Sequence, residues 1–170
     1  MNYKYLIRLL RMVIVLVIQV LILNHIHILG YITPLLMGYV IIPFHRGSSR
    51  IEMLLWGFIT GFLFDIFSNT AGMASASCTL LAMFQPSLLT LFTPRDAAED
   101  FTPSIKTIGV WQYILFSMLC MLIVHATFYA LDAFTIYNWQ LTLTAILGGT
   151  LTATFLSFTA ELLSRNKYQK

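Results

Sequence analysis

The stretch that decides the fold is residues 57–72, which read GFITGFLFDIFSNTAG. It places one carboxylate, Asp65, in a run that is otherwise apolar enough to lie in a bilayer. An Asp inside a membrane helix costs roughly 2.5–3.5 kcal/mol on insertion scales, so it needs a polar setting or a task. Gly57, Gly61 and Asp65 follow one another at spacing four and share one stripe of a helix. This stripe predicts a helix that packs closely on a neighbour and shows it a polar group.

The composition predicts an integral membrane protein. Of the 170 residues 58% are hydrophobic and only 10% are charged, with a mean hydropathy of +0.80. That is too little polar surface to cover a water-soluble globule. No long linker interrupts the apolar segments, so residues 1–170 are expected to form a single domain. The net charge of +3 is too small and too scattered for nucleic-acid binding, which we exclude.

Apolar segments of the right length predict the membrane spans. A spanning helix needs about 20 mostly apolar residues. Segments that meet this test are about 9–29, 51–68, 72–93, 111–131 and 139–161. A further segment, 31–44, is short and contains Pro34 and Pro43. Because proline suits the first turn of a helix and disfavours its interior, we expect Pro34 to open a helix there.

The basic residues decide whether segment 31–44 crosses the membrane. Lys and Arg collect in cytoplasmic loops. If the segment crosses, all ten basic residues lie on the cytoplasmic side; if it does not, they divide into three and seven. The sequence therefore predicts an all-α bundle of six transmembrane helices with both termini cytoplasmic. Loop 94–110 would be the largest cytoplasmic loop, and almost nothing would lie outside the membrane.

Small residues predict where helices approach one another, because lipid offers no hydrophobic reason for them to associate. In the fourth predicted span and the last one they recur at spacing four, and the positions expected at helix contacts are Ala74, Cys78, Ala82, Gly148 and Gly149. Cys78 and Cys120 lack any Cys-x-x-Cys spacing. We therefore expect buried, unpaired thiols and no metal site.

Three interpretations of Asp65 stay open. Its carboxylate caps the next helix or meets water near the outer interface; it holds the turn at 68–72 by hydrogen bonds within the bundle; or it relays protons or binds an ion. Gly72 is expected to supply a turn conformation that other residues resist. Ser68 and Asn69 are expected to satisfy loose backbone groups in the same turn.

The other polar residues within the spans predict no catalytic site. His25 and His27 point in different directions on a helix and do not chelate one metal together. His125 and Asp132 either share a face through Tyr129 or are independent polar groups near the interface. Ordinary hydrogen bonds between helices are expected of the amides Gln19, Asn24 and Gln85.

Enzyme motifs are absent from the sequence. It contains no G-x-S-x-G, no H-E-x-x-H and no phosphate-binding glycine loop. A pairing of Ser75 or Ser77 with His125, as in a membrane protease, is conceivable on residue types alone. We expect a protein that is not an enzyme and needs no cofactor and no metal.

The motif Gly61-x-x-x-Asp65-x-x-Ser68-x-x-x-Gly72 resembles the signature of the MreD family of rod-shape-determining membrane proteins. The resemblance covers essentially the whole chain, including its length, span number and short second span. It implies a fold like that of the substrate-binding subunits of energy-coupling-factor transporters. It also implies MreC as a partner, association with MreB, RodA and the elongation transpeptidase, and a scaffolding or regulatory role in the bacterial inner membrane.

A vitamin-like small-molecule binding subunit of an energy-coupling-factor transporter is the alternative. Such a subunit needs a polar pocket open to the outside and a first span with small-residue ridges. The first span here is bulky throughout, and the predicted outer loops are too short to gate a pocket.

Overall fold

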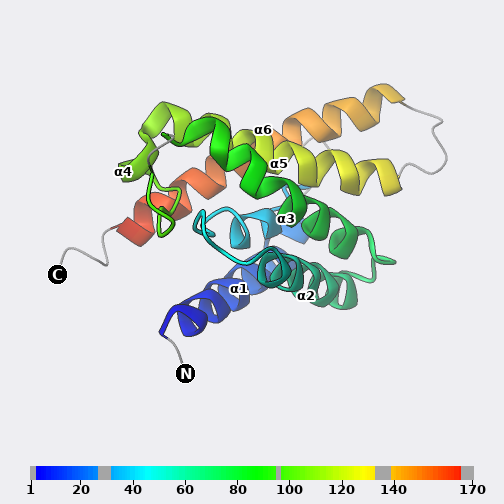
Figure 1. Ribbon diagram of the computed structural model, residues 1–170. Helices are drawn as coiled ribbons and strands as arrows, with labels where there is room; N and C mark the ends of the chain where they lie inside the picture. Colours follow the sequence, from blue (N-terminus) through cyan, green and yellow to red (C-terminus); the bar gives the residue numbers. More distant parts are fainter. Residues whose placement is uncertain (1–2, 27–31, 95–96, 133–138, 166–170) are drawn as a thin grey trace.

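Five long helices account for most of the chain (Figure 1). The computed structural model describes residues 3–26, 32–94, 97–132 and 139–165. The long helices are α1 (Tyr3–Leu21), α2 (Arg50–Ser68), α3 (Met73–Phe92), α5 (Val110–Asp132) and α6 (Trp139–Arg165). Each carries, alone or with the short turn after it, a stretch long and apolar enough to cross a membrane. The all-α class is therefore confirmed, and five of the expected spans are helices long and apolar enough to cross, which is consistent with a multi-pass membrane protein.

The ends of these helices lie close to their expected positions, with two differences. The first helix begins before residue 9 and ends at Leu21, after which a separate 3-10 helix, η1 (Leu23–His25), follows. In addition, the loop 94–110 contains a one-turn helix, α4 (Ile105–Ile108), that the sequence analysis did not predict. A capping box between Ser104 and Thr107 forms its first turn.

The prediction of a helix at 31–44 is wrong. The described part, residues 32–44, is irregular except for one short 3-10 helix, η2 (Met37–Val40). Pro34 and Pro43 explain the difference, because a proline lacks an N–H and disfavours the helical conformation at the residue before it. The eight residues between the two prolines could form only about two helical turns, and a helix that short is marginal without support from its surroundings.

Helices α1 and α2 run in the same direction. Near their beginnings Arg8 pairs with Glu52, and at the far end Asn24 donates to the hydroxyl of Ser68 at 2.7 Å. The chain must therefore return along the length of the bundle between the two helices. Residues 32–44 make this return, which we call the central segment.

The central segment forms the middle of the hydrophobic core. Helix α2 packs on α3, α3 on α5, and α5 on α6, while η2 contacts α1, α2, α3 and α5 (Figure 1). Met37, Ile41 and Ile42 are completely buried. The helices thus wrap around a segment that is irregular apart from η2.

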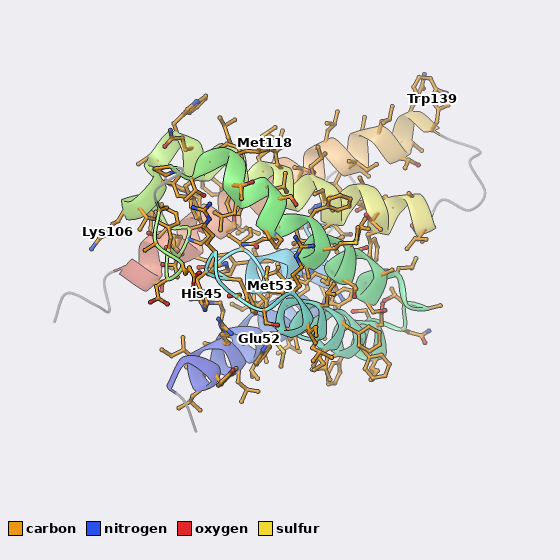
Figure 2. The ribbon with its side chains drawn as sticks, viewed as in Figure 1. His45, Glu52, Met53, Lys106, Met118 and Trp139 are labelled. Carbon is orange, nitrogen blue, oxygen red and sulfur yellow. The ribbon has the colours of Figure 1, made fainter. Side chains whose placement is uncertain are left out.

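Charged groups gather at one end of the bundle. There the loop after the central segment pairs with the loop after α3, with Arg46 N–H donating to the carbonyl of Phe101 at 2.9 Å and Gly47 N–H to that of Glu99 at 2.8 Å. Figure 2 shows Lys106 at this end and Trp139 at the opposite one. We call it the charged end.

Candidate functional site

Glycines on α2 bring its backbone against α3. A Cβ added at Gly61 would overlap backbone atoms of Ala74. A Cβ at Gly57 would lie 2.8 Å from the carbonyl oxygen of Cys78 and 3.1 Å from the Cβ of Ala82. The glycine stripe of α2 therefore lies directly on the small-residue stripe of α3, as the spacing of both predicted.

Asp65 caps the amino end of α3. One carboxylate oxygen accepts hydrogen bonds from Ala74 N–H at 3.0 Å and from the Thr70 hydroxyl at 2.5 Å, and the other accepts from Ser75 N–H at 2.9 Å. The first N–H groups of a helix lack partners within it, and a negative charge there is favoured by the helix dipole. Asp65 is only 7% exposed. Both oxygens are thus occupied by donors, which matches the capping and turn-holding interpretations together.

The turn between α2 and α3 depends on two residues with left-handed backbone conformations. Asn69 has φ of 53° and closes α2, and Gly72 has φ of 80° directly before α3. The turn role expected of Gly72 is therefore confirmed. Ser68 behaves differently from the expectation, because its hydroxyl accepts the hydrogen bond from Asn24 and so ties α2 to η1.

The two adjacent glycines of α6 face different neighbours. A Cβ at Gly148 would lie 2.7 Å from the Cδ1 of Ile32 in the central segment. A Cβ at Gly149 would overlap the imidazole ring of His125, with Nε2 only 2.8 Å away. The absence of a side chain at Gly149 therefore leaves room for the His125 ring.

Buried amides hold the backbone of the central segment. Gln19 is completely buried; its amide nitrogen donates to the carbonyl of Pro34 at 2.9 Å and its oxygen accepts from Leu36 N–H at 2.6 Å. Gln85 donates to the carbonyls of Ile42 and Phe44, both at 3.3 Å. These residues were expected to join helices, but their partners are backbone groups of a non-helical segment.

His125 has the same task. Its Nε2 accepts a hydrogen bond from Leu35 N–H at 3.1 Å, and its Nδ1 lies 2.8 Å from the carbonyl of Met121. These partners require the neutral tautomer that carries its proton on Nδ1. The ring stacks on Tyr129, whose hydroxyl accepts from Thr33 N–H at 3.1 Å.

This arrangement answers one question that the sequence left open. His125 does meet Tyr129, as the shared-face interpretation required. Asp132, however, is exposed at the end of α5 and forms no hydrogen bond with either residue in the described part of the chain. The pair His125 and Tyr129 therefore acts on the central segment without the carboxylate.

The anchors have a common physical reason. Non-helical backbone at membrane depth is tolerated only where the protein itself supplies hydrogen-bond partners. Each buried donor or acceptor left unpaired costs about 1–3 kcal/mol. We call Gln19, Gln85, His125 and Tyr129 the anchor residues, because together they satisfy backbone groups along the central segment. Their signal in the sequence is a set of lone polar residues on three spans, opposite an apolar segment that contains two prolines.

The conceivable serine–histidine pair is not assembled. Ser75 donates to the carbonyl of Gly72 at 2.9 Å, and Ser77 donates to that of Met73 at 2.7 Å. Both nitrogens of His125 have the partners given above. No serine hydroxyl is thereby presented to this imidazole.

The two thiols, Cys78 and Cys120, are free and buried, as predicted. Within the described ranges, histidine, cysteine and acidic side chains form no group of three or more that could hold a metal ion.

Comparison with known proteins finds no family model, no curated protein and no solved structure that matches this chain. The function proposed below therefore rests on the motif, the chemistry of the residues and their geometry.

Proposed function

We propose that this protein is a non-enzymatic scaffold or regulatory subunit of the bacterial cell-wall elongation complex, of the MreD type. The observation that carries the proposal is the corner between α2 and α3. There each of the four motif positions has a structural role. Gly61 allows the backbone of α3 to approach α2, and Asp65 caps α3. Gly72 adopts the turn conformation, and Ser68 accepts a hydrogen bond from Asn24. This structural use of every motif position supports a scaffold more than a catalytic site.

Six crossings with both termini cytoplasmic belong to the same proposal. The parallel course of α1 and α2 supports it, because the central segment then crosses between them in a non-helical form. Cysteines introduced at Glu99, Lys170 and Thr135 test the topology, since the native thiols are buried. We expect a membrane-impermeant reagent to label only Thr135→Cys in intact cells. Labelling of Glu99→Cys from outside would contradict the six-crossing topology.

The partners proposed are MreC, the MreB filament, RodA and the elongation transpeptidase, in the bacterial inner membrane. Large apolar side chains cover the outward faces of α1 and α2, including Leu10, Val17, Leu55 and Phe62, each about half exposed. Such faces suit lipid and the membrane helices of partners. The charged end offers the polar surface at which a cytoplasmic filament would be met.

The small-molecule transporter subunit remains the alternative. Its ligand would need space among the helices, but the central segment fills the middle of the bundle with completely buried side chains. This packing favours the scaffold.

Genetic context and loss of function test the proposal. Neighbouring reading frames for MreB-like and MreC-like proteins would support the scaffold, whereas frames for a transport ATPase and a coupling subunit would support the alternative. Depletion of the protein should turn rod-shaped cells round, and an affinity-tagged copy should retain the MreC-like protein. Depleted cells that keep their rod shape and width would contradict the proposal.

A further inference from the structure

A cavity of about 320 Å³ opens at the charged end, between the beginning of α1, the residues around α4 and the end of α6. Its volume lies at the lower end of the roughly 300–1,000 Å³ found for small-molecule sites. The polar side chains that line it are Arg11, Thr102, Ser104, Lys106, Glu161 and Ser164. Pro43, Pro103 and Ile105 supply an apolar wall. The cavity is remote from the corner between α2 and α3.

The cavity holds both signs of charge, and Arg11 and Glu161 attract each other across Tyr39 without forming a direct ion pair. The Arg11 guanidinium lies over the ring of Tyr39, 5.7 Å from its centroid, and donates no hydrogen bond within the described part of the chain. Glu161 accepts a hydrogen bond from the Tyr39 hydroxyl at 3.1 Å, and neither Arg11 nor Lys106 lies within ion-pair distance of it. The two cations and the carboxylate are therefore available to different parts of one ligand.

The position of the cavity indicates an amphipathic ligand. It lies where α1 begins and α6 ends, at the charged end of two helices that are long and apolar enough to cross a membrane. Leu163, next to the lining residue Ser164, is 71% exposed, and so is Trp111 at the beginning of α5. Tryptophan at the end of a span is typical of the interface between lipid tails and water. A ligand with a charged head and an apolar body fits these surroundings.

We propose that this cavity binds a phosphoethanolamine group, as carried by an aminophospholipid of the surrounding leaflet. The phosphate lies against Arg11 and Lys106, and the ammonium donates to Glu161. Arginine and lysine are the usual partners of phosphate oxygens. A ligand with phosphate alone would leave Glu161 beside a second negative charge, whereas a phosphate with an ammonium matches both signs. The inference does not depend on the scaffold function, since it concerns a different part of the molecule.

The experiment measures lipid retention on the full-length protein by native mass spectrometry, after purification in detergent. Phosphatidylethanolamine is compared with phosphatidylglycerol, which lacks the ammonium, and with phosphatidylcholine, whose ammonium has no N–H to donate. We expect phosphatidylethanolamine to be retained about three to five times better than the other two, as one exposed ion pair allows. Equal retention of the three lipids would overturn the proposal.

Variants assign the two ends of the ligand. Arg11→Gln and Lys106→Gln should each lower retention of phosphatidylethanolamine and phosphatidylglycerol alike. Glu161→Gln should abolish only the preference between them. Tyr39→Phe removes the hydrogen bond to Glu161 but keeps the carboxylate, so it should keep the preference and controls for disturbance of the core. Arg50→Gln, at the exposed beginning of α2, is the matched control and should change nothing.

One result would contradict the role of Glu161. It is a Glu161→Gln protein that has the melting temperature of the wild type and still retains phosphatidylethanolamine in full preference to phosphatidylglycerol. Soluble phosphoethanolamine distinguishes the source of the group. If millimolar amounts displace the lipid, the head group alone is recognised; if not, the apolar body contributes as well. Both results support the phosphate-and-ammonium chemistry, and the comparison of the three lipids decides it.

Discussion

The hairpin of α2 and α3 and the central segment are both buried and largely apolar, but their backbones are satisfied in different ways. Each helix of the hairpin bonds most of its own N–H and carbonyl groups, and at the corner between the helices Asp65 supplies the acceptors for the start of α3. The central segment has few internal bonds and takes its partners from side chains of α1, α3 and α5. Close packing therefore stabilises the hairpin, whereas hydrogen bonds from side chains of other helices stabilise the central segment.

The largest expected effect is in the hairpin. Gly61→Leu places a side chain where backbone atoms of α3 already lie, and backbone yields less readily than a flexible side chain. We expect a loss of more than about 3 kcal/mol of folding free energy, at the upper end of overpacking effects, and little protein in the membrane. Thermal melting of the purified protein and its cellular amount are the measurements. Ile59→Leu, on the exposed side of the same helix, is the control; a normal Gly61→Leu would contradict the packing described here.

Asp65→Leu should have the next largest effect. We expect it to lower the folding free energy by about 3 kcal/mol, because two buried backbone donors lose their acceptors. Asp65→Asn should fall between Leu and the wild type, since one amide oxygen replaces one of the two carboxylate oxygens. Melting temperatures and complementation of cell shape, at matched protein levels, measure both. If Asn folds normally but fails as completely as Leu in complementation, the carboxylate handles protons or ions and the capping account is insufficient.

Gln19→Leu tests the hydrogen bonds that side chains of other helices make to the backbone of the central segment. The change leaves Leu36 N–H and the Pro34 carbonyl without partners, and we expect a loss of about 2 kcal/mol. Gln140→Leu, at the exposed start of α6, is the control for adding a leucine. A Gln19→Leu protein as stable as the wild type would show that packing alone holds the central segment.

The smallest effect is expected at Gly149, where close packing and the hydrogen bonds that hold the central segment meet. Gly149→Ala pushes a methyl group against the His125 ring, which is itself held by Leu35 and Met121, and should cost about 1–2 kcal/mol. In a His125→Ala background the same change should cost almost nothing, because the ring is gone. A double-mutant cycle on melting free energies measures this coupling. Additive effects would mean that Gly149 and His125 do not constrain each other.

The hairpin was predictable because its signals are local. The spacing of Gly57 and Gly61, the acid one turn later and the small residues of α3 all lie within one pair of neighbouring helices. The same holds for the positions of the five long helices, since each is an apolar run of sufficient length.

The central segment was not predictable because its support comes from far along the chain. An apolar run with two prolines is compatible with a short helix until the partners of its backbone are known. Those partners are side chains on three separate helices, and nothing in the spacing of Gln19, Gln85 and His125 connects them. The cavity at the charged end likewise brings together residues from α1, α4 and α6 that share no motif.

The order in which the chain is synthesised matters for the central segment. Gln19 precedes it, but 90 residues separate Leu35 from His125, 96 separate Thr33 from Tyr129, and 122 separate Tyr39 from Glu161. A nascent chain that ends before α5 therefore holds unpaired backbone groups at its centre. The bonds to His125 and Tyr129 can form only once α5 has been made, and the bond to Glu161 only once α6 has been made. The interior of the bundle is therefore completed late, and products truncated before α5 keep unpaired polar groups that the complete protein does not have.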